Sequence, residues 1–330
     1  MSGLTYKEAG VDIEEEDEAI SALRDTVLFA RKGKGAPLES EFTGLVEFGD
    51  FALSMCTDGV GTKLIVANKM KKWDTVGIDC IAMNVNDAIC QGAEPIAFVD
   101  YLAFEDPDPE LARQLGKGLQ KGAELANITI IGGETATLGE IINGFDIAGT
   151  ALGYVKKEDI IDGKSVSPGD KIIGLPSSGI HSNGLTLARK IVDGSDHDYE
   201  DETDFGKIGE ELLVPTRIYT EVVLDALEKY DIKGMANITG GGLKNIARIN
   251  KNFQYVIEDQ LEPQPIFNFL QQEGNISDKE MYKTFNMGMG FTMITDENIA
   301  EKVAALVDGK IVGKVKKGSG VIHKEKKLKY

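Results

Sequence analysis

The stretch TDGVGTK, from Thr57 to Lys63, follows the apolar run FALSMC and contains residue types that handle charge. It is too polar to fill a core, and its glycines disfavour a continuing strand. Glycines let backbone N–H groups approach an anion, and a lysine supplies a point charge for phosphate. Neither a Walker A loop nor a dinucleotide-binding fingerprint fits the glycine spacing. The stretch favours a phosphate loop and a tight turn with a surface lysine about equally. The loop's candidate ligands are Asp58, Gly59, Gly61, Thr62 and Lys63.

A second polar set lies within residues 74–90, which we expect to be helical. Asp79, Asn84, Asn86 and Asp87 stand there among isoleucine, methionine, valine and alanine. Asp79 and Asn86 lie about 20° apart around a helix, so a polar stripe crosses an apolar helix. A buried carboxylate requires a cation or a hydrogen-bond network. A solvated face is the alternative, but no Lys, Arg or Glu follows Lys72 on this helix.

Glu134 follows two glycines at the end of the predicted strand ITIIGG. Carboxylates at strand ends beside glycine suit a hard cation such as Mg²⁺, which takes one or two carboxylates together with phosphate oxygens and water. We therefore expect Asp58, Asp87 and Glu134 to form a metal and phosphate site. Asp100 in FVDY is a further candidate for this rim, although a turn aspartate explains it better.

The stretch SSGIHSNG, Ser177 to Gly184, lies between a predicted strand and a predicted helix. An exposed helix N-terminus with nearby glycines binds phosphate or carboxylate. His181 titrates near neutral pH in its ordinary range and is therefore a candidate general acid or base. A helix-capping role is the alternative. We expect His197 and His323 to be solvated, and the glycine turn ITGGGLKN to lie on the same cleft or merely to close a turn. The substrate-binding candidates are Ser178, Gly179, His181 and Asn183.

Alternating strands and helices must position these residues, which predicts an α/β chain with mixed α+β sheets in two domains. In the first domain we expect strands at 51–57, 95–104, 128–133 and 145–155 and helices at 74–90 and 109–126. In the second we expect strands at 171–177, 233–239, 254–259, 289–295, 310–315 and 320–328, and helices at 182–192, 215–230, 243–250 and 297–307, with two short helices before 285. The predicted limits are a mobile arm at 1–45, then 46–163 and 164–330.

The composition narrows the function classes. The 330 residues carry a net charge of −18 and a pI near 4.7, which argues against nucleic-acid and anionic-membrane surfaces. Lysines from Lys314 to Lys329 fit a charged edge strand better than a nucleic-acid patch. The three cysteines, Cys56, Cys80 and Cys90, have no zinc spacing, which predicts free buried thiols in a reducing compartment. Without a signal-peptide pattern or a membrane-spanning run, we expect a cytoplasmic protein.

The order and spacing of several long motifs resemble one family over nearly the whole chain. The motifs are TYKEAGVD, TDGVGTK, GIDCIAMNVNDAICQGAEP, IIGGETA, AGTALGYV, SSGIHSNGLTLARKI, PTRIY, ITGGGL and EMYKTFNMGMG. The chain is identified by them as a member of the phosphoribosylformylglycinamidine cyclo-ligases, also called aminoimidazole ribonucleotide synthetases.

The resemblance implies a homodimer in which the N-terminal domains share a β-barrel, with ATP near that interface. It implies an ATP- and Mg²⁺-dependent ring closure of formylglycinamidine ribonucleotide in purine biosynthesis. Asp58, Asp87 and Glu134 would then surround Mg²⁺ and the phosphates, with Lys63 and Asp79 also in the ATP site. His181 and Asn183 would belong to the substrate loop, and Lys7 to a mobile arm that closes over the site.

Three alternatives stay open on the sequence alone. Selenophosphate synthetase of the same superfamily needs a reactive cysteine near its N-terminus, and none precedes Cys56. Thiamine monophosphate kinase lacks the TYKEAGVD arm and PTRIY. A non-catalytic nucleotide-binding regulator is expected to have lost Asp87, Glu134 or His181, all of which are present.

Overall fold

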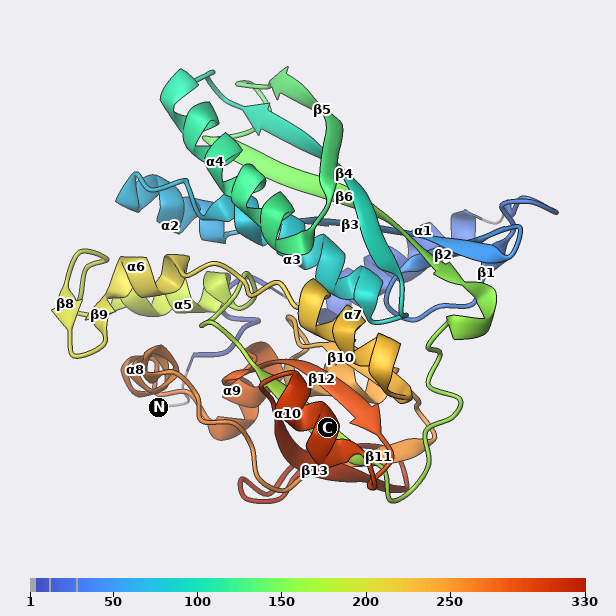
Figure 1. The fold of residues 1–330 in the computed structure, drawn as a ribbon. Helices are drawn as coiled ribbons and strands as arrows, with labels where there is room; N and C mark the ends of the chain where they lie inside the picture. The colour runs from blue at the N-terminus through green and yellow to red at the C-terminus, as the bar shows by residue number, and fades with distance from the viewer. Residues whose placement is uncertain (1–3, 12, 28) are drawn as a thin grey trace.

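The structure is a computed structural model that describes residues 4–11, 13–27 and 29–330. Two mixed sheets, each with its own helices, lie one above the other (Figure 1), which confirms the predicted α/β class. The chain passes from the first sheet to the second between Lys156 and Lys171, through the short 3₁₀ turn η1 (Lys157–Asp159). The connection between the two sheets therefore contains no long element.

The first sheet is open and has six strands, and within the described residues it does not close into a barrel. Strands β4 and β5 pair in parallel, whereas the other neighbours are antiparallel. The four strands predicted here are present. The spatial order is β1 (Pro37–Leu38), β2 (Gly44–Phe48), β3 (Phe51–Gly59), β6 (Phe145–Lys156), β4 (Glu94–Phe104) and β5 (Thr129–Thr137).

Two long helices pack on one side of this sheet, and both were predicted. Helix α3 (Val76–Ile89) contacts β3, β4 and β6, and α4 (Pro109–Ala126) packs against α3. The two helices approach so closely that a side chain at Gly77 would begin 2.4 Å from the backbone nitrogen of Leu119. Glycine at this crossing is therefore a packing requirement. Helix α2 (Lys63–Met70), which the sequence analysis does not predict, follows the TDGVGTK loop.

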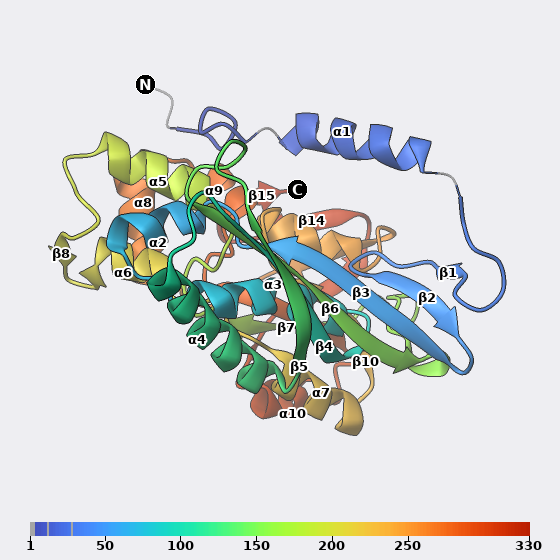
Figure 2. The ribbon, with the colours of Figure 1, turned by 90° about the horizontal axis from the view of Figure 1, so that it is seen from above.

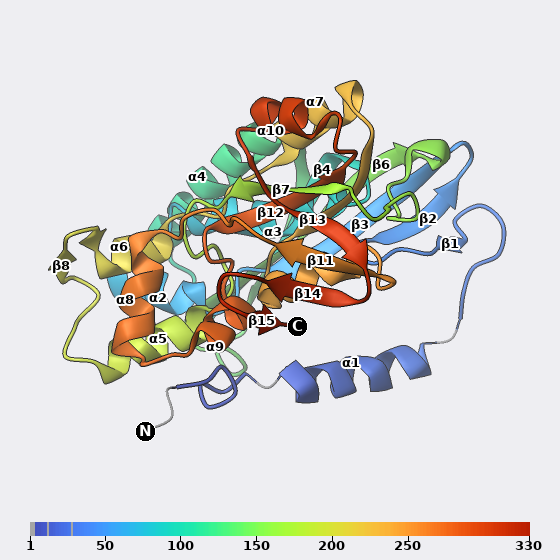
Figure 3. The same ribbon diagram turned by 90° about the horizontal axis from the view of Figure 1, so that it is seen from below.

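The opposite face of the first sheet has no helix over its central strands (Figure 2). Apolar side chains on this face are exposed, including Met55 at 55%, Val99 at 38% and Tyr101 at 42%. Helix α1 (Ile13–Thr26) lies to one side of the body, away from this face (Figures 2 and 3). A large exposed apolar face on a sheet is unusual in a monomer and is typical of an interaction surface.

The second sheet has seven strands, and only β11 and β14 pair in parallel. Helix α10 (Ala300–Leu306) packs on β7 and β13 (Figure 3). The 3₁₀ helix η2 (Gly242–Arg248) packs on β10, β11 and β14. The order is β10 (Ile232–Asn237), β12 (Met289–Thr295), β7 (Lys171–Pro176), β13 (Lys310–Lys317), β11 (Phe253–Ile257), β14 (Gly320–His323) and β15 (Leu328–Lys329), with a separate hairpin of β8 (Glu202–Thr203) and β9 (Gly206–Lys207). The helices are α5 (Leu185–Gly194), α6 (Ile208–Leu213), α7 (Thr220–Lys229), α8 (Pro265–Glu273), α9 (Asp278–Thr284) and α10 (Ala300–Leu306).

Three sequence expectations for the second domain need correction. The helix predicted at 215–230 begins only at Thr220, and the residues PTRIY before it have no regular secondary structure. The predicted helix at 243–250 is the 3₁₀ helix η2. His323 is buried rather than solvated, because it packs on Tyr282 and pairs with Gln260 at 2.7 Å. The lysine-rich C-terminus does form the edge of the sheet, through β15, as predicted.

All three cysteines are buried and free, as predicted. Among the described residues, no helix combines the length and the apolar character that crossing a membrane requires.

Candidate functional site

The polar stripe of α3 is buried between the two domains. The side chain of Asp79 is fully buried, and its Oδ1 atom accepts hydrogen bonds from the Thr216 backbone N–H at 2.7 Å and from the Ser182 hydroxyl at 3.0 Å. Asn86, also fully buried, donates to the Arg217 carbonyl at 2.8 Å and accepts from the Tyr219 N–H at 3.0 Å. The stripe therefore anchors PTRIY, and the alternative of a solvated face is wrong. These bonds also explain why PTRIY is not helical.

Lys63 completes this buried network. Its ammonium group lies 2.9 Å from Asp79 Oδ2 and donates to the Val214 carbonyl at 2.7 Å, with neither ionic side chain exposed. Burial lowers the pKa of Lys63, and the carboxylate of Asp79 opposes that effect. The alternative of a tight turn with a surface lysine is therefore wrong. In this conformation the charges of Lys63 and Asp79 satisfy each other, and their roles in ATP binding stay predictions.

The glycine loop itself lies at the junction of the domains. Gly59 ends β3, and Gly61 adopts a φ of +68°, which glycine accommodates without strain. The Thr62 hydroxyl lies 2.8 Å from the hydroxyl of Thr186, at the start of α5. The loop of the first domain thus contacts the helix that follows SSGIHSNG in the second domain.

The SSGIHSNG loop lies at the same junction. Gly179 is buried, and its carbonyl accepts a hydrogen bond from Asn286 at 2.9 Å. Ser178, the residue before it, is exposed. A side chain at Gly240 would begin 3.3 Å from Asn183 Oδ1. The glycine turn ITGGGLKN therefore lies beside Asn183. This position fits the expectation that the turn belongs to the same cleft.

His181 occupies the interior of this loop. It adopts a φ of +64°, is 2% exposed, and its Nε2 atom accepts from the Ser178 N–H at 3.2 Å. Burial, helped by the charges of Lys63 and Arg217, lowers the pKa of His181 to about 3. The imidazole is therefore neutral at neutral pH. The argument that His181 titrates near neutral pH is wrong, and what remains is a hydrogen-bonding or positioning role.

Asp58 and Asp87 interact electrostatically at the first-domain side of the junction. Burial raises the pKa of Asp58, against a hydrogen bond from Gly59. Burial also raises the pKa of Asp87 to about 6, with the charge of Asp58 adding to the rise and a hydrogen bond from Asn237 opposing it. Asn84 donates to the Asp58 carbonyl, and its buried Oδ1 atom has no hydrogen-bond partner within the described residues. Carboxylates and an unpaired amide oxygen are the types of ligand that suit a hard cation.

Glu134 does not join these two carboxylates. Asp58 pairs with Gly149 and Asp100 with both Gly149 and Gly133, so this row of residues faces α3. Glu134 pairs with Tyr101 in the next row, which faces away from α3. In the part of the chain that the structure describes, no group of three or more His, Cys, Asp or Glu side chains could hold a metal ion. The described residues of a single chain therefore do not bring Asp58, Asp87 and Glu134 together. The three-carboxylate site stays a prediction.

The arm that carries Lys7 contacts the second domain. The Tyr6 N–H donates to Glu280 at 3.0 Å, Lys190 donates to the Glu8 carbonyl at 3.4 Å, and Ala9 is buried. The arm is thus docked at its start and continues into α1. Its predicted mobility is not addressed by these contacts.

Sequence reasoning missed several polar residues at the junction. The sequence analysis placed Arg217 in a predicted helix over PTRIY and therefore gave it no role at the junction. Asn237 contacts Asp87, and Arg248 donates to the Glu41 carbonyl and lies 4.2 Å from the centre of the Phe42 ring. The only available signal was the occurrence of Arg217 in a motif of the resembling family.

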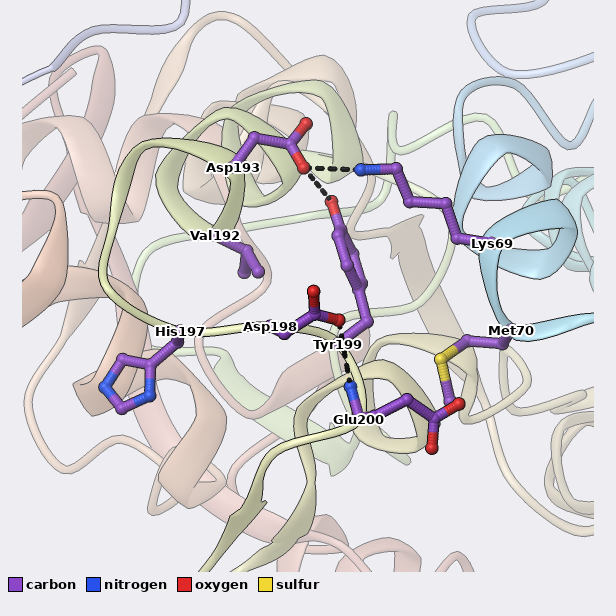
Figure 4. Close-up of a pocket in the computed structure, with 8 residues that line it drawn as sticks. All are labelled: Lys69, Met70, Val192, Asp193, His197, Asp198, Tyr199 and Glu200. Atoms are coloured by element: carbon purple, nitrogen blue, oxygen red, sulfur yellow. Dashed lines mark hydrogen bonds and ion pairs between the residues drawn. The ribbon is translucent and has the colours of Figure 1, made fainter.

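A cavity of about 420 Å³ lies away from these residues, between α2 and the loop after α5 (Figure 4). Lys69 and the hydroxyl of Tyr199 both point at Asp193, at 2.6 and 3.0 Å. Lys69 and Asp193 therefore already pair with each other across the domain junction.

Known protein families account for both halves of this arrangement. Residues 41–155 match the family model "AIR synthase related protein, N-terminal domain", and residues 167–325 match "AIR synthase related protein, C-terminal domain". This chain belongs to the AIR synthase related family. Among its relatives, a phosphoribosylformylglycinamidine cyclo-ligase of Methanosarcina mazei is 55% identical over 317 residues, 94% of this chain and 95% of that protein. The cyclo-ligase of Methanocaldococcus jannaschii is 53% identical over 322 residues, 94% of this chain and 92% of that protein.

Several solved structures share the fold of this chain at low sequence identity. The thiamine monophosphate kinase of Aquifex aeolicus is 16% identical, with a TM-score of 0.63 over 96% of this chain and 99% of that chain. The hydrogenase maturation protein HypE in complex with ATP is 17% identical, with a TM-score of 0.64 over 95% of this chain and 92% of that chain. These similarities show the fold alone.

Proposed function

We propose that this chain is a phosphoribosylformylglycinamidine cyclo-ligase that closes the ring of formylglycinamidine ribonucleotide to give aminoimidazole ribonucleotide, ADP and phosphate. The observation that carries the proposal is identity of more than half over almost the full length of relatives with that name. The similarity to a kinase is confined to the fold, at 16% identity, so a small-molecule kinase is the weaker candidate.

In the proposed reaction, the formyl amide oxygen attacks the γ-phosphorus of ATP and ADP leaves. The amidine-side nitrogen then attacks the activated carbon, and phosphate departs with the former amide oxygen as the ring closes. An amide oxygen is a weak nucleophile, so the main tasks of the protein are positioning, charge neutralisation and exclusion of water.

Asp58 and Asp87 would hold Mg²⁺, which would neutralise the phosphates of ATP. Support comes from the charge of Asp58, which helps to raise the pKa of Asp87, and from the unpaired oxygen of Asn84, whose amide group donates to the Asp58 carbonyl. The glycine loop would hold the ATP phosphates, and the SSGIHSNG loop the ribonucleotide, with His181 as a neutral group. Lys63 and Asp79 would act indirectly, because their contacts fix the glycine loop to the second domain.

We also propose a homodimer formed through the open face of the first sheet, as the family resemblance implies. Support comes from the exposed Met55, Val99 and Tyr101 on that face. Such a dimer would cover Glu134, which faces the same way. Division into an arm at 1–45 and domains at 46–163 and 164–330, and a cytoplasmic location, belong to the same proposal.

The test is an assay with ATP, Mg²⁺ and formylglycinamidine ribonucleotide that follows phosphate and the imidazole product together. Equal amounts of both products are expected. Asp87→Asn should lower kcat by about a hundredfold or more, the range for loss of one preorganised group that stabilises charge. Asp106→Asn, on an exposed turn, is the matched control. Phosphate without the imidazole would indicate ATP hydrolysis that is not coupled to ring closure, and neither product would indicate a kinase with another acceptor or a regulator.

A further inference from the structure

Arg217 is a cation that the protein leaves largely unused. Its Nη1 atom donates to the Pro176 carbonyl at 3.1 Å, and its guanidinium carbon lies 5.1 Å from the centre of the Tyr219 ring. The ion pairs of the described residues do not include it. A guanidinium carries five N–H donors, so most of its hydrogen-bonding capacity is uncommitted. The side chain is only partly buried and can reach a ligand.

The backbone around Arg217 is held unusually firmly for a segment without secondary structure. Asn86 accepts from the Tyr219 N–H and donates to the carbonyl of Arg217 itself, and Asp79 accepts from the Thr216 N–H. The guanidinium group itself donates to the Pro176 carbonyl. A charged group held in this way loses little side-chain freedom when it binds a ligand.

The position of Arg217 places this cation beside the predicted substrate loop. Pro176 is the last residue of β7, and the exposed Ser178 follows two residues later. Ser178 also donates to the Pro215 carbonyl at 2.6 Å, so the loop and PTRIY are joined directly.

The charge of the ligand follows from the surroundings. The chain carries a net charge of −18, so a cation without a carboxylate partner at the domain junction attracts an anion selectively. Arginine recognises phosphate through paired N–H donors. The phosphates of ATP have a different candidate partner, the metal expected at Asp58 and Asp87. A phosphomonoester without a metal needs a protein cation instead.

We propose that Arg217 binds the ribosyl phosphate of the ribonucleotide substrate through its guanidinium group. This proposal rests on the proposed function, because it takes the phosphoribosyl group from the substrate named for the relatives. Arg217 would thereby position the ribonucleotide against the SSGIHSNG loop.

The test compares Arg217→Met, which keeps length and apolar contact with Tyr219, with Arg217→Lys, which keeps the charge but loses the fork. The KM for the ribonucleotide should rise at least about tenfold in Arg217→Met, as for loss of charge-assisted hydrogen bonds, and less in Arg217→Lys. The KM for ATP should stay within about twofold. Arg113→Met, on the exposed surface of α4, is the control and should change neither.

A second measurement separates this proposal from the proposed function. Ribose 5-phosphate binding is measured by calorimetry with the wild-type protein and Arg217→Lys and Arg217→Met, without ATP. The proposal requires binding that weakens in Arg217→Met and is partly restored in Arg217→Lys, whether or not the wild type closes the ring. Unchanged binding and an unchanged ribonucleotide KM overturn it. A rise in the ATP KM alone also overturns it, by placing the guanidinium at the nucleotide. If Arg217→Met does not fold, Arg217→Lys with wild-type ribonucleotide KM and binding overturns the proposal.

Discussion

The buried pair of Lys63 and Asp79 allows a quantitative test of how the two domains are joined. Asp79→Asn keeps the shape of the side chain and an oxygen that can accept from Thr216, but it removes the negative charge. The ammonium group of Lys63 then lies 2.9 Å from a neutral amide position, and its remaining acceptors, the Oδ1 position at 3.0 Å and the Val214 carbonyl at 2.7 Å, are both uncharged. Because neither side chain is exposed, water cannot compensate for the loss.

The expected magnitude follows from this isolation. Removal of one partner of a buried ion pair typically destabilises a protein by about 3–5 kcal/mol. Asp79→Asn and Lys63→Met should each lower the free energy of unfolding by that order. The double variant should be less destabilised than the sum of the single variants, by about 2 kcal/mol or more, because it no longer buries an unpaired charge.

The measurement is equilibrium unfolding in urea for the wild type, both single variants and the double variant. The chain supplies a matched control in Lys69 and Asp193, which pair at 2.6 Å across the same domain junction with side chains 43% and 41% exposed. Their double-mutant cycle should give at most about 1 kcal/mol. Single losses below about 1 kcal/mol at Lys63 and Asp79, or additive effects within about 0.5 kcal/mol, would refute the argument.

Three further predictions concern the site and its surfaces. Burial lowers the folded-state pKa of His181 to about 3, so the unfolded chain binds one proton more between about pH 6.5 and pH 3. Stability should therefore fall as pH drops through this window, on the order of 1 kcal/mol per pH unit more steeply than in His181→Asn, as urea unfolding across pH will measure. Val99→Glu should convert a dimer to a monomer in light scattering, whereas the exposed Glu140→Gln should not. Deleting residues 1–10 should lower the rate of ring closure while the far-ultraviolet circular dichroism stays unchanged, and an unchanged rate would reject a closing arm.

Much of the fold follows from local pattern, because periodicity reports which face of an element is buried. The helix predicted at 109–126 has the bounds of α4, and the apolar content of 74–90 identifies α3. PTRIY shows where this reasoning fails. Its residues can continue the following helix, yet Asp79 and Asn86, more than a hundred positions away, form hydrogen bonds with its backbone in a non-helical form. Local propensity does not contain that information.

The candidate site shows the same division between residue type and environment. The presence of carboxylates at the end of β3 and in α3 indicates a cation site, and the charge of Asp58 does help to raise the pKa of Asp87. The chemistry of His181, in contrast, depends on burial that only the packed loop creates. Lys63 is similar, because a lysine after glycines fits a phosphate ligand and a buried ion pair equally well.

Glu134 depends on one residue of register. Phe98 of β4 pairs with Ile130 of β5, but Val99 pairs with Gly132, so Ile131 is an extra residue in β5. Without this bulge Glu134 would pair with Leu102, on the face that carries Asp58, since side chains alternate along a strand. The bulge turns Glu134 to the open face. A carboxylate on that face can join Asp58 and Asp87 only around the edge strand β5 or from a second chain, and its exposed apolar neighbours favour the second chain. The sequence analysis could place Glu134 at a strand end but not on a face, because a bulge in a pair of strands is set by both strands together.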